Sequence, residues 1–368
     1  MANPEESALR VRPGCPAPEP PRDLIAQVSS RRRSFSRRQY VDGILAGDRT
    51  ILAQAITLIE SSRAADRDLA ELIVEDCLPH SGNSIRVGIT GVPGAGKSSV
   101  IEVLGTFLIV EQLQKVAVLA IDPSSQLSGG SILGDKTRMT SLASSQMAFI
   151  RPSPSRGSLG GVAQRTREAM LLCEAAGYRN ILVETVGVGQ SETAVHDMVD
   201  FFLLLMLAGA GDELQGIKRG VMELADIVAI NKADGTNLAA AEKARTEAQN
   251  ALHYLPGSLS GWTPRALTCS AQTGKGIPEL WNCVLEHTEL TKANGWFSLT
   301  RRDQTRRWMH EIIQQGLLHQ FESHPAILKL MEALEQEVLE GRTTSFRAAR
   351  TLLDLYAHPG PADKHSPE

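Results

Sequence analysis

Short apolar runs separated by amphipathic stretches dominate the middle of the chain. Each run is rich in β-branched or aliphatic residues and is too short for a helix of ordinary length. Near-continuous apolar runs are typical of parallel strands, because helices cover both faces of such a sheet. The runs span residues 85–90, 116–121, 148–150, 181–183, 202–207, 227–230 and 266–269. Their alternation with helical patterns, such as 162–176 and 239–255, predicts an α/β fold with a doubly wound, mostly parallel sheet.

The flanks of this region have a different pattern. Residues 39–79 carry aliphatic residues at helical spacing among charges, with a break at Gly47-Asp48, and a short linker follows at 79–83. Beyond residue 300 the strand patterns stop. Helical patterns then cover 301–320, 326–339 and 345–356. We therefore expect a helical extension on each side of the sheet domain.

The two ends of the chain lack the apolar residues that a core requires. The first 23 residues have no apolar run and contain a cluster of five prolines, Pro13, Pro16, Pro18, Pro20 and Pro21. Such a segment cannot bury enough surface to offset its ordering entropy. The predicted division is a disordered tail at 1–38, a helical segment at 39–84, the α/β domain at 85–295, a helical segment at 296–358 and a disordered end at 359–368.

Composition narrows the class of protein. The chain has 38 Lys plus Arg against 42 Asp plus Glu, a net charge of −4, and this balance argues against a generic nucleic-acid binder. The most apolar run, 201–208, is far shorter than the ~20 residues that span a bilayer. We expect a soluble protein that binds neither nucleic acid nor membrane, in the cytoplasm of a bacterium or the mitochondrial matrix of a eukaryote.

The five cysteines are widely scattered and form no Cys-x-x-Cys pair. An odd, dispersed set of this kind fits a reducing compartment and predicts neither a disulfide framework nor a structural zinc site. The cysteines are Cys15, Cys77, Cys173, Cys269 and Cys283.

A phosphate-binding loop is the most specific motif. It matches G-x-x-x-x-G-K-[ST] and stands between a predicted strand and a predicted helix, which is the context the motif requires. Its residues are Gly91, Val92, Pro93, Gly94, Ala95, Gly96, Lys97 and Ser98, with Ser99 next to it. Glycines let the backbone N–H groups converge on phosphate oxygens, and the helix N-terminus adds positive potential. Lys97 then reaches the outer phosphates, and the Ser98 hydroxyl can bind Mg²⁺.

Asn231-Lys232-Ala233-Asp234, which follows a predicted strand, indicates guanine as the base. The Asp234 carboxylate can accept hydrogen bonds from the two N–H donors on one edge of guanine, which adenine lacks. Asn231 can contact the purine and brace the loops. Ser270-Ala271-Gln272, after the last predicted strand, can supply a backbone N–H to the guanine oxygen. The motif alone would also fit a helix cap, but its order after the phosphate loop favours a guanine nucleotide.

Carboxylates at two strand ends indicate the magnesium and hydrolytic centre. Glu184-Thr185-Val186-Gly187 ends one strand, so that Glu184 can orient Mg²⁺ and the Gly187 N–H can sense the γ-phosphate. Asp122 and Asp135 are further candidate ligands, although Asp122 also fits a turn or cap and Asp135 local loop structure. No residue is indicated as the general base. Arg138 and Lys218 can neutralise transition-state charge, or are solvated loop charges.

Together these motifs resemble the MeaB/MMAA family, GTPase chaperones of adenosylcobalamin-dependent methylmalonyl-CoA mutase. The resemblance covers about residues 40–330, and two segments carry it most specifically, 183–192 (VETVGVGQSE) and 209–218 (GAGDELQGIK). It implies a P-loop GTPase domain at 85–295 that binds GTP or GDP with Mg²⁺, and a homodimer formed through the C-terminal helices at 296–358. It also implies catalytic roles for Lys97, Asp122, Asp135, Glu184 and Gly187.

The resemblance further implies a partner. Such a protein would bind the mutase and gate the loading, protection and reactivation of its cofactor, and the mutase would stimulate GTP hydrolysis. Residues 209–220 would form a switch toward the partner, with Gln215 and Lys218 in it. Relatives serve other acyl-CoA mutases, such as isobutyryl-CoA mutase, so the client stays open.

Three alternatives are weaker. A nickel metallochaperone GTPase for hydrogenase or urease shares the Glu-x-x-Gly pattern but needs clustered thiolate or imidazole ligands. A transport-associated ATP-dependent kinase conflicts with the guanine motif at 231–234. A scaffold that does not hydrolyse nucleotide would leave the predicted magnesium ligands without a use.

Overall fold

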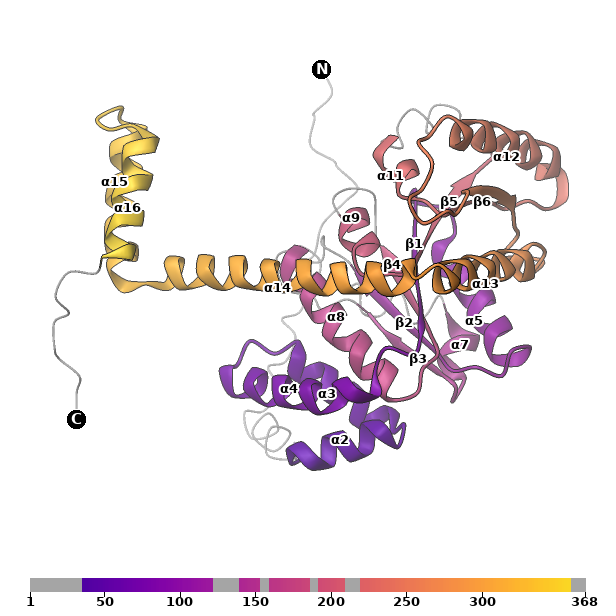
Figure 1. Cartoon of the computed structure of the whole chain (residues 1–368), viewed down its shortest axis with the longest axis horizontal. Coiled ribbons are helices and arrows are strands. Elements are labelled where there is room, and N and C mark those ends of the chain that lie inside the picture. The colour runs from indigo at the N-terminus through magenta and orange to yellow at the C-terminus, as the bar shows by residue number, and fades with distance from the viewer. Residues whose placement is uncertain (1–34, 122–138, 153–158, 186–190, 209–218, 359–368) are drawn as a thin grey trace, which may run out of the picture.

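The structure is a computed structural model, which describes residues 35–121, 139–152, 159–185, 191–208 and 219–358. Its centre is a parallel sheet in which seven strands are ordered β3-β2-β4-β1-β5-β6-β7 in the described part of the chain (Figure 1). The strands are β1 (Ile85–Gly91), β2 (Val116–Ile121), β3 (Ala148–Arg151), β4 (Asn180–Thr185), β5 (Phe201–Leu207), β6 (Ile227–Asn231) and β7 (Arg265–Thr268). The predicted doubly wound α/β fold is confirmed.

The strand order places β1 at the switch point of the sheet. β1 pairs with β4 on one side and with β5 on the other, so that Val87 lies level with both Leu182 and Phe201. The earlier strands β2 and β3 lie beyond β4, and the later strands β6 and β7 lie beyond β5. Ligands bind outside the carboxyl ends of strands at such a point, and the loop after β1 lies there.

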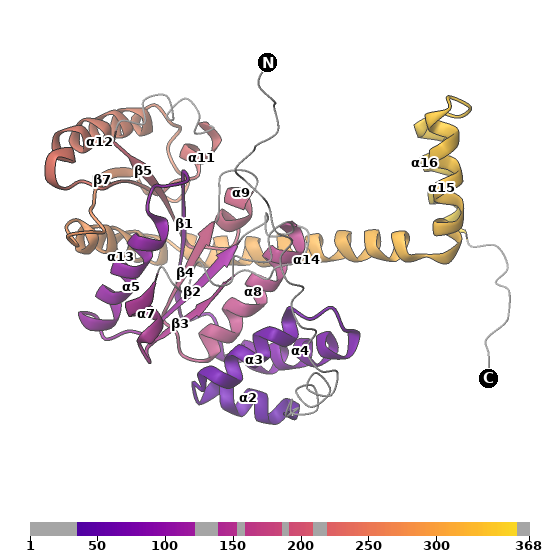
Figure 2. The same cartoon turned by 180° about the vertical axis from the view of Figure 1, so that it is seen from behind.

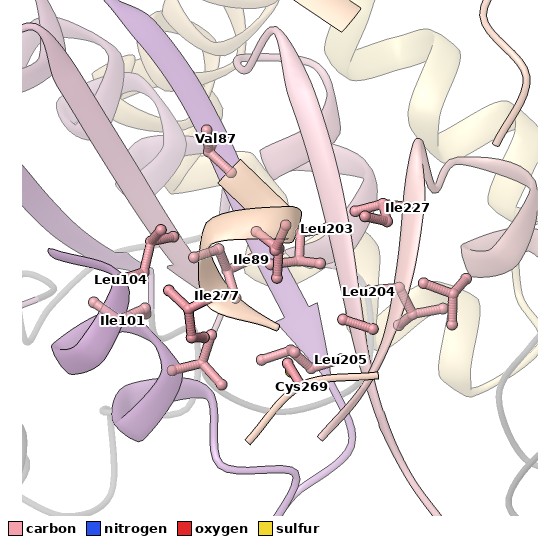
Figure 3. Close-up of a cluster of buried hydrophobic side chains, with 14 of the residues drawn as sticks. Val87, Ile89, Ile101, Leu104, Leu203, Leu204, Leu205, Ile227, Cys269 and Ile277 are labelled. Atoms are coloured by element: carbon pink, nitrogen blue, oxygen red, sulfur yellow. The ribbon is translucent and has the colours of Figure 1, made fainter. Parts of the chain in front are cut away.

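The sheet is covered on both faces, which explains its uninterrupted apolar strands. One core joins the sheet to helices α5 and α13, and Figure 3 shows a part of it that includes Ile89, Leu104 and Leu203. The second core joins the opposite face to α8, α9 and the N-terminal helices. The helices of the domain are α5 (Lys97–Val110), α7 (Thr140–Ser144), α8 (Leu159–Ala175), α9 (Ser191–His196), α11 (Arg219–Glu223), η2 (Gly235–Asn237), α12 (Leu238–His253) and α13 (Ile277–Ala293).

Three N-terminal helices pack below α8 in Figure 1, with a short 3₁₀ turn after them. They are α2 (Arg37–Leu45), α3 (Arg49–Ile59), α4 (Ala64–Cys77) and η1 (Leu78–His80). Helix α2 begins two residues before the predicted start at residue 39, because Ser36 forms a capping box with Gln39. The predicted tail at 1–38 otherwise lies outside the described residues.

The C-terminal segment is a long helix followed by a helical hairpin. Helix α14 (Trp296–Ser323) has 28 residues, and α15 (Pro325–Leu339) packs on α16 (Ser345–Ala357) at its far end. Figures 1 and 2 show the hairpin projecting well away from the sheet domain. We call α14–α16 the C-terminal arm. No helix in the described residues is long and apolar enough to cross a membrane.

Candidate functional site

The predicted phosphate loop lies between β1 and α5 and has the backbone that its glycines allow. Gly91, Gly94 and Gly96 all have positive φ, and Gly96 in the left-handed region caps α5. A Cβ on Gly91 would overlap the carbonyl oxygen of Leu205 on β5. Glycine is therefore required at Gly91, since the loop turns directly over the neighbouring strand.

Lys97 lies half-buried at the start of α5 and bonds to its own loop. Its Nζ donates to the carbonyl oxygen of Gly91 at 2.8 Å and to that of Val92 at 3.4 Å. Burial lowers the pKa of Lys97, while the nearby carboxylates of Glu184 and Glu192 act to raise it. The ammonium group is thus held among oxygen atoms at the head of the loop, where an outer phosphate could replace the carbonyls.

A hydroxyl and a carboxylate meet beside this lysine. The Ser98 hydroxyl donates to Glu184 Oε1 at 3.1 Å, and Glu184 is buried at the end of β4. The next residue, Thr185, donates its hydroxyl to that of Thr90 at 2.9 Å, which fixes the ends of β4 and β1 together. Hydroxyl and carboxylate oxygens are the ligands that Mg²⁺ prefers, so Ser98 and Glu184 fit this ion.

Asn231, at the end of β6, joins the phosphate loop to the loop after β7. Its Nδ2 donates to the carbonyl oxygen of Ala95 at 2.7 Å, and its Oδ1 accepts from the backbone N–H of Ala271 at 3.2 Å. A Cβ on Gly96 would lie 2.7 Å from the same Nδ2. The amide therefore braces the two loops, and Gly96 provides the room for it.

Asp234 and Ser270 lie together next to this brace. The Ser270 hydroxyl donates to the Asp234 carboxylate and accepts from the backbone N–H of Thr273 at 3.1 Å. Lys232 has a left-handed backbone with φ 59° and an exposed side chain, and Gln272 is exposed. The structure thus brings the residues of both predicted base-contact motifs to one edge of the sheet.

Several predicted site residues lie outside the described residues, namely Asp122, Asp135, Gly187, Gln215 and Lys218, together with Arg138. Among the described ones, Pro93 and Ser99 are exposed and Val92 is buried. Their assigned roles stay predictions.

The sequence motifs assign no role to Glu192, although it is the last residue of the segment 183–192. Glu192 lies in the first turn of α9, is 2% exposed, and acts electrostatically on Lys97. An acidic residue in the first turn of a helix that follows the predicted γ-phosphate sensor is the signal that could have indicated it.

Within the described ranges, no group of three or more His, Cys, Asp or Glu side chains is arranged to hold a metal ion. Cys77, Cys173, Cys269 and Cys283 are all buried, and burial raises the pKa of Cys77 to about 11 and that of Cys269 to about 12. Thiols with such pKa values are protonated and inert near neutral pH.

Comparison with known proteins agrees with this geometry. The sequence profile of the family described as "Methylmalonyl Co-A mutase-associated GTPase MeaB" matches residues 52–326. The chain is 50% identical to "GTPase ArgK" of Escherichia coli over 74% of its own length and 82% of that protein. It is 44% identical to "Methylmalonic aciduria type A homolog, mitochondrial" of Mus musculus, over 91% of its length and 83% of that protein.

A solved structure is similar over nearly the whole chain. The crystal structure titled "LAO/AO transport system kinase" has a TM-score of 0.70 and 37% sequence identity. The match covers 87% of this chain and 97% of that one. The sheet domain and most of its helical flanks therefore share one architecture with that protein.

Proposed function

Because this chain belongs to the family of methylmalonyl-CoA mutase-associated GTPases, we propose that it is a magnesium-dependent GTPase serving an adenosylcobalamin-dependent acyl-CoA mutase. Its role would be to bind the mutase and gate loading, protection and reactivation of the cofactor. The family accounts for the GTPase activity and for guanine nucleotide binding. The mutase client, with methylmalonyl-CoA mutase as the first candidate, and the magnesium ion are the parts that we propose.

The observation that carries the nucleotide assignment is the double role of Asn231. It holds Ala95 in the phosphate loop and Ala271 in the loop after β7 at the same time. The Asp234–Ser270 pair lies beside it, so that one nucleotide could place its phosphates on Lys97 and its base on Asp234. A carboxylate that accepts two N–H donors favours guanine over adenine.

The chain's own residues fit the charge compensation that hydrolysis requires. Ser98 and Glu184 would hold Mg²⁺, which supplies charge neutralisation to the phosphates when it is bound. Lys97 would exchange its bonds to Gly91 and Val92 for an outer phosphate oxygen. Phosphoryl transfer needs positioning and charge compensation more than covalent catalysis, so this set is suited to the reaction.

We further propose that the protein forms a homodimer through the C-terminal arm. Met309, Ile313 and Leu317 recur every four residues on α14 and are 52%, 49% and 54% exposed. On α15 and α16, Leu339 is 81% and Phe346 is 87% exposed. An apolar stripe of this kind on a projecting arm fits a second copy of the same stripe.

The test is hydrolysis of GTP and of ATP by the full chain, alone and with purified acyl-CoA mutases. We expect GTP to be hydrolysed slowly alone and faster with the client mutase, and ATP to compete poorly. Equal competition by ATP would contradict the guanine assignment and favour a kinase. No stimulation by any adenosylcobalamin-dependent acyl-CoA mutase would contradict the chaperone role.

A variant separates the partner role from the chemistry. Lys218→Ala should leave basal hydrolysis near the wild-type rate and reduce stimulation by the mutase. A collapse of basal hydrolysis would instead place Lys218 in the reaction itself.

A further inference from the structure

A cavity of about 330 Å³ lies at the edge of the sheet opposite the nucleotide-binding loops. The phosphate loop and the 231–234 motif lie at the carboxyl ends of β1 and β6, whereas this cavity lies at the amino ends of β5 and β6. Helices α13 and α14 supply much of the rest of its wall. We call it the amino-edge cavity. Its volume is at the lower end of the range for small-molecule sites, so a ligand of modest size would fit.

The Asp and Arg side chains that line this cavity are paired with an opposite charge, with one exception. The pairs are Asp200–Arg301 at 2.7 Å, Asp303–Arg306 at 3.2 Å and Arg307–Asp197 at 3.2 Å. Asp226 also lines the cavity, its side chain is 23% exposed, and no Lys or Arg pairs with it in the part of the chain that the structure describes. The wall therefore presents one carboxyl group without a counter-charge.

The nearest histidine does not supply the missing charge. His287 Nε2 lies 3.7 Å from Asp226 Oδ1, which is beyond hydrogen-bond distance, and burial lowers the pKa of His287 to about 4, so its ring is neutral near pH 7. His196 also lines the cavity and acts to lower the pKa of Asp226, but burial outweighs it and raises that pKa to about 7. A positive charge bound beside Asp226 would favour its ionised form.

The backbone and one oxygen of Asp226 are held in place. Its N–H donates to the Phe202 carbonyl at 2.9 Å, and its carbonyl accepts from Trp262 Nε1 at 2.9 Å. Its Oδ2 accepts from the Phe202 N–H at 2.8 Å. No described residue donates to Oδ1, so a positioned carboxyl group keeps one oxygen open to a ligand.

The rest of the wall offers aromatic rings and a further acceptor. Gln304 Nε2 donates to the Val199 carbonyl at 2.8 Å, whereas the buried Gln304 Oε1 has no hydrogen-bond partner among the described residues. An ammonium group has three N–H donors and no acceptor, and it is attracted to the faces of aromatic rings. The aromatic side chains of the wall are Phe201, Phe202, Trp296 and Phe297.

We propose that the amino-edge cavity binds a small organic cation, with its ammonium group on Asp226 Oδ1 and its apolar body against the aromatic rings. The charge of such a ligand balances the single unpaired carboxyl group of the wall. A metal ion suits the cavity less well, because no group of three or more His, Cys, Asp or Glu side chains is arranged to hold one in the described ranges. The proposal is independent of the GTPase function, since the cavity lies at the other edge of the sheet.

The experiment compares two probes of equal size on the full chain. Benzylamine carries one ammonium group on one ring, and benzyl alcohol is its neutral counterpart. Dissociation constants are measured by ligand-observed NMR titration at pH 7, with GDP and Mg²⁺ present so that the nucleotide site is occupied. We expect benzylamine to bind more tightly than benzyl alcohol by about tenfold, because only the amine pairs with Asp226.

Matched variants locate the ammonium group. Asp226→Asn keeps the shape of the side chain and removes its charge, so it should weaken benzylamine binding by about tenfold and leave benzyl alcohol binding unchanged. Asp303→Asn removes a carboxylate of the same wall that is already paired with Arg306, and it should bind both probes as the wild type does. Thermal unfolding without the probes establishes that both variants are folded.

The dependence on pH is a second readout. Because Asp226 ionises around pH 7, the affinity of the wild type for benzylamine should rise by about tenfold from pH 6 to pH 8, and that of Asp226→Asn should stay nearly constant. The other titratable side chains of the wall are present in both proteins, so their effects largely cancel in the comparison. They are His196, Asp200, His287, Asp303 and Arg307.

Three results would overturn the proposal. The folded wild type binds no benzylamine, or it binds benzylamine and benzyl alcohol equally, or Asp226→Asn binds benzylamine as tightly as the wild type. None of these results bears on the GTPase assignment, which hydrolysis of GTP tests separately.

Discussion

The sheet domain and the C-terminal arm treat apolar side chains in opposite ways. In the sheet, Ile89, Leu203 and Ile230 are each 0% exposed. On the arm, Leu339 and Phe346 are more than 80% exposed. Burial within this one chain accounts for the apolar side chains of the sheet domain, whereas the arm leaves apolar side chains exposed, as the proposed homodimer requires.

The ion pairs of the two regions differ in burial in the same way. Arg86 and Glu174 pair at 2.8 Å at the amino edge of the sheet, with side chains 5% and 0% exposed. Arg342 and Glu340 pair at 2.6 Å on the arm, where both side chains are about half exposed. A buried pair becomes costly when it is broken, while an exposed pair contributes little, and this difference can be measured.

Breaking the buried pair should have the largest effect. Glu174→Gln leaves the Arg86 guanidinium buried without its counter-charge, and we expect a loss of about 3–5 kcal/mol in the free energy of unfolding. Urea denaturation followed by circular dichroism measures it. The matched change on the arm, Glu340→Gln, should leave the midpoint unchanged. Similar losses in both variants would contradict the contrast between the regions.

Removing the charge of Lys97 should have the second largest effect. Lys97→Ala should weaken GTP binding by about 100-fold or more, because the outer phosphates lose a charge-assisted bond. Calorimetry measures the dissociation constant. Lys275→Ala, at an exposed lysine near Ser270, serves as the control and should bind normally. Unchanged affinity in the Lys97 variant would refute the phosphate-loop assignment.

A charge in the apolar stripe tests whether the arm is covered by a second copy. Leu317→Glu should weaken self-association by about 30-fold, since a carboxylate would have to be buried in the interface. Analytical ultracentrifugation provides the dissociation constant, and Gln314→Glu adds the same charge beside the stripe. A wild-type chain that stays monomeric at high concentration would disprove the dimer.

The free energy of unfolding should depend on pH through Asp226, which lies where the sheet domain meets the start of α14. Burial raises the pKa of Asp226 to about 7, although the Phe202 N–H and His196 act to lower it. Above its usual pKa of about 3.9 the unfolded chain loses this proton while the folded chain keeps it, so stability falls as pH rises from about 4 to 7. The side chain in Asp226→Asn cannot ionise. The free energy of unfolding of this variant, relative to the wild type, should therefore rise by on the order of 2 kcal/mol as pH increases from 4 to 7.

That gain is separable from the neighbouring histidine. Burial lowers the pKa of His287 to about 4, and its Nε2 lies 3.7 Å from Asp226 Oδ1. Because His287 is present in both proteins, its titration largely cancels in the difference between them. Asp226 and Asp303 both line the amino-edge cavity at the start of α14. Asp303→Asn, at the more exposed of these two carboxylates, should show no such trend. A gain that is independent of pH would mean that Asp226 is ionised in the folded protein.

The smallest expected effect is on the preference for guanine over adenine. Asp234→Asn places a donor where guanine needs an acceptor, so the preference for GTP over ATP should fall by about tenfold. Competition binding with both nucleotides measures this preference. An unchanged ratio would show that other atoms of the loops select the base.

The sheet could be predicted from the sequence because its strands are apolar on both faces. Six of the seven predicted runs lie within strands, and the run 266–269 extends one residue beyond the end of β7 at Thr268. The predicted run 181–183 is shorter than β4, because Asn180, Glu184 and Thr185 are polar yet buried.

The helical patterns predicted from the sequence do not include α13. Its buried face includes His287, Thr288 and Thr291 as well as aliphatic residues, which interrupts the apolar periodicity.

The parts of the site that could be predicted are those whose residues lie close together in the sequence. The phosphate loop and the 231–234 motif are each one continuous segment, and the spacing of the residues within each is sufficient to recognise it. The brace formed by Asn231 is predicted, but its partner Ala95 and the electrostatic effect of Glu192 on Lys97 depend on strand order, which a motif does not contain. The face of α14 that carries Arg301, Gln304 and Glu311 has the polar composition of a solvent-facing helix surface, and only its tertiary contacts distinguish it.

The length of α14 has a geometric consequence for any partner of the arm. Its 28 residues span about 42 Å at 1.5 Å per residue. A tilt of about 5° at the root would therefore carry the far end through about 4 Å, roughly the width of a methyl group. A partner surface packed against α15 and α16 would fit their side chains at one tilt of α14 and clash with them at another. A small rotation of α14 where it leaves the sheet domain would therefore decide whether the partner can bind at the far end.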